Sequence, residues 1–110
     1  MNIQIFGKSK SFDTKKAERW FKERRIKFQS VDLIKYGMSR GEFDSVRRAV
    51  GLAALIDEGA KGAEMIKYLA YEEAKIEKLL EDQSLIKAPI VRNGRQATVG
   101  YCPEVWEKWE

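Results

Sequence analysis

The chain contains no histidine and a single cysteine, Cys102, among its 110 residues. Without histidine it cannot build a Ser-His-Asp or Cys-His catalytic site. One cysteine also excludes an intramolecular disulfide, a redox-active cysteine pair and a cysteine-based zinc site. We therefore predict that the chain holds no metal and performs no chemistry that needs two thiols or an imidazole.

Long apolar segments are absent as well. The apolar run at residues 52–56 is far too short to cross a bilayer. The N-terminal residues enter a strand-like alternation at once, with no basic segment followed by an apolar one, so we expect no secretory signal and a cytoplasmic protein. Hydrophobic residues make up 44% and charged residues 35% of the chain, a balance typical of soluble globular proteins. We expect one domain over residues 1–110 and a monomer.

The net charge of +4 would suit an acidic partner, but Lys and Arg alternate with Glu and Asp along most of the chain. A protein that binds nucleic acid through one basic face concentrates its positive charge. The charge pattern therefore argues against nucleic-acid binding.

Hydrophobic periodicity predicts a strand, a helix and a second strand in the first third of the chain. Residues 2–6 alternate polar and apolar side chains, residues 11 to about 25 have apolar residues every three or four positions, and residues 26–33 form the second strand. Ser11 or Asp13 would cap the helix by accepting a hydrogen bond from a first-turn amide. The residues predicted to face the core are Ile3, Ile5, Ala17, Trp20, Phe21, Phe28, Val31 and Leu33.

The middle of the chain is predicted to be helical. The sequence Ser-Arg-Gly-Glu at residues 39–42 has the spacing of a capping box and opens a helix that Gly51 closes. Helical periodicity continues over residues 60–81, with a break near Tyr71. The sequence thus predicts a helical insertion over about residues 38–84.

A hairpin and a closing helix complete the chain. Asn-Gly at residues 93–94, between the predicted strands 89–92 and 95–99, favours a two-residue type I′ turn. Pro103 fits the first turn of a last helix, where its missing N–H costs nothing. The residues predicted to pack this helix on the sheet are Val105, Trp106 and Trp109.

The resulting order is β-α-β, a helical insertion, then β-β-α. A strand-helix-strand unit joined to a hairpin and a closing helix is the skeleton of the thioredoxin fold. We therefore predict an α/β protein with a thioredoxin-like fold and a mixed sheet of about four strands.

In such a fold the turn after the first strand and the start of the first helix form the reactive corner. Exposed helix amides and the positive end of the helix dipole stabilise an anion there and lower the pKa of a thiol. In this chain Ser11 and Thr14 stand at the spacing of a Cys-X-X-Cys pair, and neither carries sulfur.

At these residues the chain resembles the ArsC/Spx family, the arsenate reductase-related branch of glutaredoxin-like proteins. The matching segments are Lys-Lys-Ala at residues 15–17, Gly51 followed by the acidic turn at 56–57, and Ala-Pro-Ile-Val at 88–91 leading to Val-Gly-Tyr at 99–101. Together they span nearly the whole chain.

The resemblance implies roles for two corner residues. Ser11 falls on the catalytic cysteine, which in arsenate reductases attacks the oxyanion and is released by glutathione, glutaredoxin or thioredoxin. Thr14 falls on the second cysteine that Spx-type members use in their redox switch. No bound cofactor is expected, and a thiol of this kind would serve only as co-reductant.

The resemblance also implies a binding site for a small oxyanion around Pro89, a proline expected to follow a cis peptide bond. The family usually has an arginine immediately before this proline, where this chain has Ala88, with Lys87 one place earlier. Lys8 and Lys10 would flank the corner amides. The alternative for these lysines is a solvated basic rim.

Ser11 cannot replace a thiol in a redox cycle. A serine hydroxyl has a pKa far above that of a thiol, no histidine is present to act as its base, and oxygen cannot form a mixed disulfide. The residue is expected to act as a helix N-cap, and the chain to be redox-inactive in this form. A natural loss and a replaced cysteine both fit the sequence, and Cys102 has no assigned role.

Two functions follow from the resemblance. The first is a thiol reductase of the ArsC type, inactive here because of Ser11. The second is an Spx-like regulator that binds the α-subunit of RNA polymerase, because Gly51 falls on the glycine of that contact.

Overall fold

Four strands form one mixed sheet in the computed structural model, which describes residues 1–109. The sheet order is β2-β1-β3-β4; β1 runs parallel to β2, and β3 runs antiparallel to β1 and β4. The strands are β1 (Ile3–Gly7), β2 (Phe28–Asp32), β3 (Ile90–Asn93) and β4 (Gln96–Val99). The predicted α/β class and four-stranded mixed sheet are confirmed.

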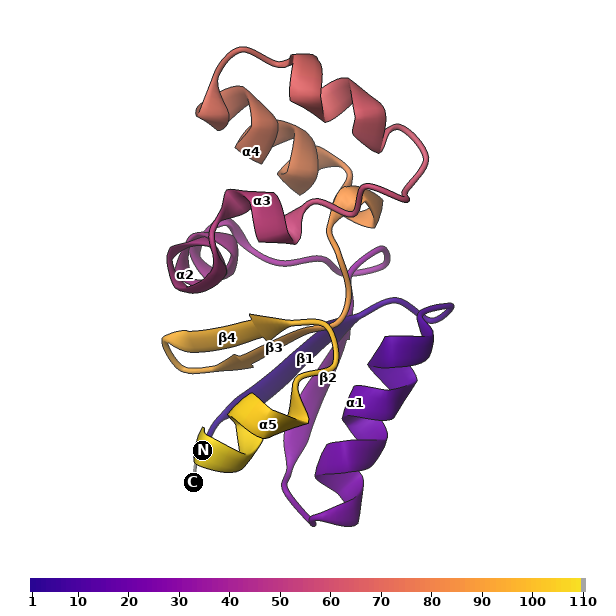
Figure 1. Ribbon diagram of the computed structural model, residues 1–110, viewed down its shortest axis with the longest axis vertical. Helices are drawn as coiled ribbons and strands as arrows, with labels where there is room; N and C mark the ends of the chain where they lie inside the picture. Colours follow the sequence, from indigo (N-terminus) through magenta and orange to yellow (C-terminus); the bar gives the residue numbers. More distant parts are fainter. Residues whose placement is uncertain (110) are drawn as a thin grey trace.

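Helices cover both faces of this sheet (Figure 1). One face carries α1 (Phe12–Glu23), α5 (Pro103–Trp106) and the 3₁₀ helix η3 (Glu107–Trp109). The other carries what we call the helical insert: α2 (Arg40–Val50), α3 (Leu52–Leu55), η1 (Ala63–Tyr68), α4 (Glu72–Glu81) and η2 (Gln83–Leu85). Within residues 1–109, no helix is long and apolar enough to span a membrane.

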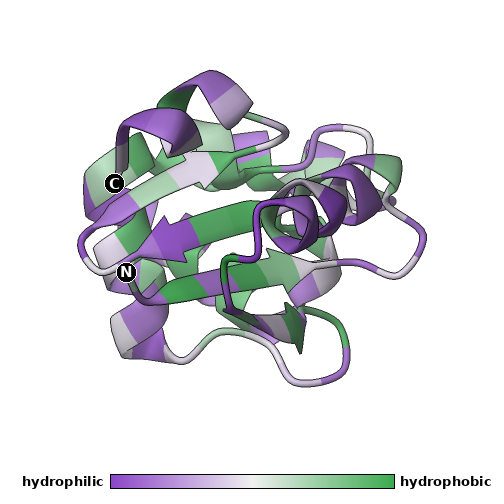
Figure 2. Cartoon of the chain, turned by 90° about the horizontal axis from the view of Figure 1, so that it is seen from below, coloured by the Kyte–Doolittle hydropathy of each residue, from purple (hydrophilic) through white to green (hydrophobic). Residues whose placement is uncertain are grey.

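Strand β1 contributes side chains to two separate hydrophobic cores, because successive side chains of a strand point to opposite faces. Ile3 and Ile5 lie in the α1-side core, and Phe6 lies in the insert-side core. Figure 2 shows the hydrophobic residues concentrated in the strands and hydrophilic residues along the outer helices. The buried members of the α1-side core are Ile3, Ile5, Ala17, Trp20, Phe21, Val91 and Trp106.

The insert-side core is aliphatic apart from two phenylalanines and one methionine. Its buried members are Phe6, Leu33, Met38, Phe43, Val46, Leu55, Ala63, Ile66, Ile76, Leu79, Leu85, Ile86 and Ile90.

The predicted capping box opens α2, since Ser39 Oγ accepts from the Glu42 N–H and the Glu42 carboxylate accepts from the Ser39 N–H.

The hairpin differs from its prediction by one residue. Asn93 still belongs to β3 and pairs with Gln96, so the two-residue loop is Gly94-Arg95 and not Asn93-Gly94. Among these residues only Gly94 has a positive φ, 61°. A positive φ at the first loop residue alone is the pattern of a type II′ turn, which favours glycine there. The type I′ prediction was therefore wrong.

Two further differences concern helices. The segment from 60 to 81 breaks near Tyr71 as predicted, but its first part is the short 3₁₀ helix η1. Met65, one of the apolar residues expected on the inner side of this segment, is 60% exposed. In α5, Trp106 is buried whereas Val105 is 37% exposed, because so short a helix presents only one side to the sheet.

Candidate functional site

The corner between β1 and α1 is a tight turn. Gly7 ends β1, the Ser11 N–H donates to the Lys8 carbonyl oxygen at 3.0 Å, and Phe12 begins α1. We call residues 7–14 the corner. The end of a strand and the start of a helix therefore meet here, as the sequence predicted.

Ser11 is the N-cap of α1. Its Oγ accepts a hydrogen bond from the Thr14 N–H at 3.1 Å, and its backbone is extended at φ −80° and ψ 118°. This contact satisfies one of the first-turn amides, which have no partner inside the helix. The predicted capping role of Ser11 is thus present in the structure, whereas the other candidate cap, Asp13, lies exposed within the first turn.

Thr14 is a packing residue. Its side chain is 7% exposed, and its Oγ1 accepts from the Lys8 N–H at 3.3 Å. A Cβ on Gly7 would lie 2.3 Å from Thr14 Cγ2, so only glycine fits opposite it. Thr14 therefore fixes the approach of β1 to α1.

Lys8 points into the protein. Its Nζ lies 3.1 Å from Asp57 Oδ2 and donates to the Ser84 carbonyl oxygen at 2.7 Å, with 14% of the side chain exposed. Asp57 follows α3 and Ser84 belongs to η2, so this contact ties the corner to the insert. Sequence reasoning missed it, because nothing local to either residue indicates a partner 49 positions away.

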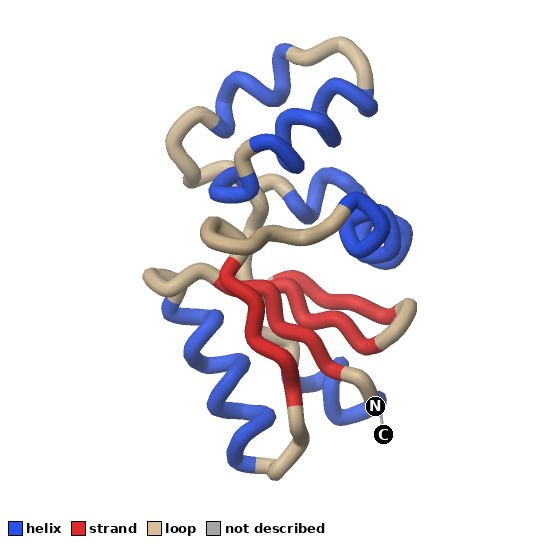
Figure 3. Tube along the Cα trace, turned by 180° about the vertical axis from the view of Figure 1, so that it is seen from behind, coloured by secondary structure: helices blue, strands red, loops and turns tan. Residues whose placement is uncertain are grey.

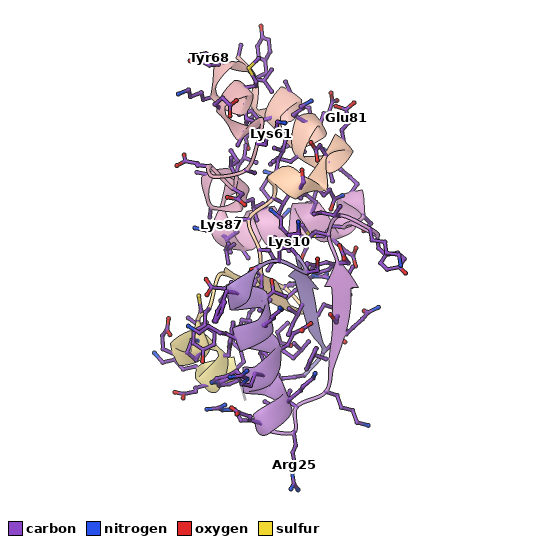
Figure 4. All side chains as sticks on the ribbon, turned by 90° about the vertical axis from the view of Figure 1, so that its right-hand side faces the viewer. Lys10, Arg25, Lys61, Tyr68, Glu81 and Lys87 are labelled. Atoms are coloured by element: carbon purple, nitrogen blue, oxygen red, sulfur yellow. The ribbon has the colours of Figure 1, made fainter. Side chains whose placement is uncertain are left out.

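Lys10 and Lys87 are both exposed, and neither forms an ion pair within residues 1–109. Figure 4 shows both at the level where the corner meets the insert. Pro89 is buried, its peptide bond to Ala88 is cis, and its carbonyl oxygen accepts from the Gly100 N–H at 2.8 Å. The expected cis-proline is thus present at the start of β3.

Gly51 lies elsewhere. It joins α2 to α3 at φ 87°, is exposed, and has no atom within 4 Å of a Cβ built on it. In Figure 1 this junction lies on the opposite side of the view from the corner. The structure therefore does not bring Gly51 together with Ser11.

Cys102 lies on the segment that flanks the first turn of α1, a proximity that the sequence did not indicate. Its Sγ donates to the Val99 carbonyl oxygen at 3.3 Å, and the neighbouring Tyr101 ring lies 4.5 Å from Lys16 Nζ. Burial, followed by the charge of Glu104, raises the pKa of the Cys102 thiol. Cys102 therefore lacks the electropositive setting that activates a thiol.

The corner thus offers a capped helix terminus without a nucleophile. Within the described residues 1–109, no group of three or more His, Cys, Asp or Glu side chains is placed to hold a metal ion. The Thr14 amide, one of the first-turn donors that an anion at this helix end could use, already donates to the serine hydroxyl.

A family model and several solved structures match this chain. The model of the ArsC family matches residues 6–109. A putative ArsC family related protein from Bacteroides fragilis superposes with a TM-score of 0.84 at 22% identity, covering 100% of both chains. An arsenate reductase from Vibrio cholerae superposes with a TM-score of 0.83 at 20% identity, covering 96% of this chain and 94% of that one.

A putative arsenate reductase from Yersinia pestis superposes with a TM-score of 0.82 at 15% identity, covering 96% of this chain and 99% of that chain. No curated protein matches. At these identities the structural matches show the fold alone, which is the thioredoxin-like fold predicted from the sequence.

Proposed function

We propose, from the premise that this chain belongs to the ArsC family, that it is a redox-inactive relative of thiol-dependent arsenate reductases. The observation that carries the proposal is the position of Ser11, whose Oγ accepts from the Thr14 N–H at 3.1 Å at the start of α1. A thiolate at this position would accept a hydrogen bond from the Thr14 N–H and would be stabilised by the positive end of the helix dipole. The corner is built for a thiol, and a serine occupies it.

A serine at this atom cannot carry the reductase cycle. Its hydroxyl keeps its proton at neutral pH, the chain has no histidine to remove that proton, and oxygen forms no mixed disulfide with glutathione, glutaredoxin or thioredoxin. Cys102 does not substitute for it, since burial raises the pKa of its thiol. The chain as it stands therefore performs no thiol-based reduction.

The surroundings of the corner support a second loss, in the binding of an oxyanion. Ala88 precedes Pro89, so the residue immediately before the cis-proline supplies no guanidinium. The Lys8 ammonium is paired with Asp57 and faces the insert. Lys10 and Lys87 remain as exposed cations, which bind a small anion weakly in water.

The test is to restore a thiol at position 11 in a chain without Cys102. We expect Ser11→Cys with Cys102→Ser to have a thiol pKa well below the ordinary value of about 8.5. The matched control is Ser9→Cys with Cys102→Ser, which places a thiol on the same exposed turn without the capping contact. Iodoacetamide reactivity against pH measures both pKa values, and mass spectrometry measures the glutathione adduct.

Three outcomes decide the proposal. A lower pKa and a glutathione adduct at position 11, neither of which occurs at position 9, support a corner built for a thiol. Equal pKa values at the two positions would reject it. Arsenate reduction by the unchanged chain, with glutathione and glutaredoxin or with thioredoxin, would reject redox inactivity.

A second candidate function is a contact with the α-subunit of RNA polymerase, as in Spx-type regulators. The observation that favours it is Gly51, exposed and with open space around it. A pull-down with the C-terminal domain of the α-subunit tests it. We expect the unchanged chain and Gly41→Arg, at an exposed glycine in the first turn of α2, to bind and Gly51→Arg to fail. Absence of binding by the unchanged chain would reject this function.

A further inference from the structure

The groove between α1 and the edge strand β2 has the features of a peptide-binding site. We propose that it binds an acidic protein segment in an extended conformation, which adds to the sheet beside β2. Figure 3 shows β2 as the outermost strand on the side facing the viewer, with α1 alongside it. The proposal is independent of the chemistry at Ser11.

Within residues 1–109, the outer edge of β2 leaves backbone groups of Phe28 and Ser30 without a backbone partner. The Leu33 N–H donates to the Gly7 carbonyl oxygen, and in a parallel pair alternate residues face the neighbouring strand. The backbone N–H and C=O groups of Val31 and Gln29 therefore point toward β1. Those of Phe28 and Ser30 point the other way, toward the open side of the sheet. An extended segment can pair with these groups, as in other complexes formed by strand addition.

Side chains of an added strand would reach α1. Ser30 Oγ donates to Glu18 Oε2 at 2.6 Å, and the Phe28 ring lies 6.2 Å from the Phe21 ring, so both β2 side chains face α1. An added strand lies about 4.8 Å from its neighbour and alternates its side chains in the same way. Every second side chain of the bound segment would thus lie over the groove.

Two hollows lie along this edge, one at each end of β2. The first, of about 500 Å³, is lined by Lys22, Arg25, Ile26, Lys27 and Phe28. The second, of about 300 Å³, is lined by residues that include Thr14, Lys15, Glu18, Ser30 and Asp32. They provide space for side chains at two separate positions of an extended segment.

The charge of the first hollow favours acidic side chains. Lys22, Arg25 and Lys27 form no ion pair within residues 1–109, and no carboxylate lines their hollow. Figure 4 shows Arg25 at the end of the molecule, beyond α1.

In the second hollow both carboxylates already have partners. Glu18 accepts from Ser30, and Asp32 Oδ1 accepts from the Ile34 and Lys35 N–H groups. These donors are neutral, so both carboxylates keep their charge beside Lys15. The positive charge of the edge is therefore concentrated in the first hollow, at Lys22, Arg25 and Lys27.

A protein segment fits this groove better than a single-stranded nucleic acid does. Nucleic-acid strands bind by stacking bases on exposed aromatic rings. The one aromatic ring of the groove, Phe28, is half-buried against Phe21, whereas the strand edge offers backbone groups that only a peptide complements.

The experiment titrates the full chain with a short peptide that alternates glutamate and valine, followed by fluorescence anisotropy and amide NMR shifts. We expect salt-dependent binding, with the largest shifts at Phe28–Asp32. Lys22→Glu should weaken binding by at least about tenfold, because it places a like charge against the peptide. Lys61→Glu, the same change on the insert, should leave binding unchanged.

A backbone variant tests strand addition itself. Ser30→Pro removes an N–H that points away from the sheet, a position where an edge strand tolerates proline. We expect it to weaken binding while Ser30→Ala does not; if Ser30→Pro does not fold, the comparison of Lys22→Glu with Lys61→Glu decides. No binding, equal binding of a lysine-valine peptide, shifts outside β2, or preference for a thymidine oligonucleotide would each overturn the proposal.

Discussion

The two faces of the sheet are stabilised in different ways. On the α1 side, rings pack on rings: Trp106 lies 5.3 Å from Trp20, 5.0 Å from Phe21 and 5.6 Å from Tyr101 between ring centroids. On the insert side the core is mainly aliphatic and is supplemented by polar contacts between residues far apart in the sequence. Aromatic rings bury large areas, so α1 and the short α5–η3 segment are enough to cover this face.

The insert needs those polar contacts because its helices are short and separated by turns. Gln83 exchanges two hydrogen bonds with the backbone of Met38, at 2.6 and 2.9 Å. Arg40 pairs with Glu73 at 2.9 Å, and Lys8 pairs with Asp57. The α1 side is therefore stabilised mainly by aromatic packing. The insert is stabilised by aliphatic packing together with hydrogen bonds and ion pairs between particular residues.

The largest effect is expected from Trp106→Ala. The side chain is 1% exposed, and its Nε1–H donates to Thr98 Oγ1 at 2.8 Å. Removing it should lower the free energy of unfolding by about 3–5 kcal/mol, through a cavity and an unpaired buried hydroxyl. Urea denaturation measures the change.

Met65→Ala on the exposed η1 is the control, expected to change the free energy of unfolding by less than about 0.5 kcal/mol. A loss below about 1 kcal/mol for Trp106→Ala would contradict the proposed dependence of this face on its rings.

A smaller effect is expected from Asp57→Asn, which removes the charge opposite Lys8. The side chains are 14% exposed for Lys8 and 34% for Asp57, so water screens the pair only in part. We expect a loss of about 1 kcal/mol and faster amide hydrogen exchange in the insert, with exchange in α1 unchanged. Glu58→Gln, the exposed neighbour, should change neither; equal effects of the two variants would contradict a specific contact.

The smallest effect concerns the pH dependence of Cys102. Burial, then Glu104, raises the pKa of its thiol, so the fold favours the protonated form. The resulting contribution to stability is present below the pKa of the unfolded chain and is lost as the pH rises through the folded pKa. We expect iodoacetamide to react with the native chain at a higher midpoint pH than with the urea-unfolded chain, and Glu104→Gln to reduce the difference. Equal midpoints would contradict it.

Local sequence predicted most elements, because their signals lie within a few residues. The alternation in β1, the capping box at Ser39, the cap at Ser11 and the proline at the start of α5 each depend on neighbours in the chain. The hairpin turn lies one residue later than predicted, because the local sequence is compatible with a two-residue turn at Asn93-Gly94 or at Gly94-Arg95 and only the pairing of β3 with β4 selects between them.

For the candidate site, too, some features follow from the sequence and others only from the tertiary structure. The sequence alone determined that position 11 holds a hydroxyl and no thiol, that no imidazole exists, and that Ala88 precedes Pro89. These are facts of residue identity, which no packing can change.

Only the tertiary structure decided which residues contact or flank the corner. It turned Lys8 toward Asp57 and placed Cys102 beside the first turn of α1. Both arrangements bring together residues that are separated by many positions in the chain. Such proximity follows from how the sheet and helices pack, and local sequence carries no record of it.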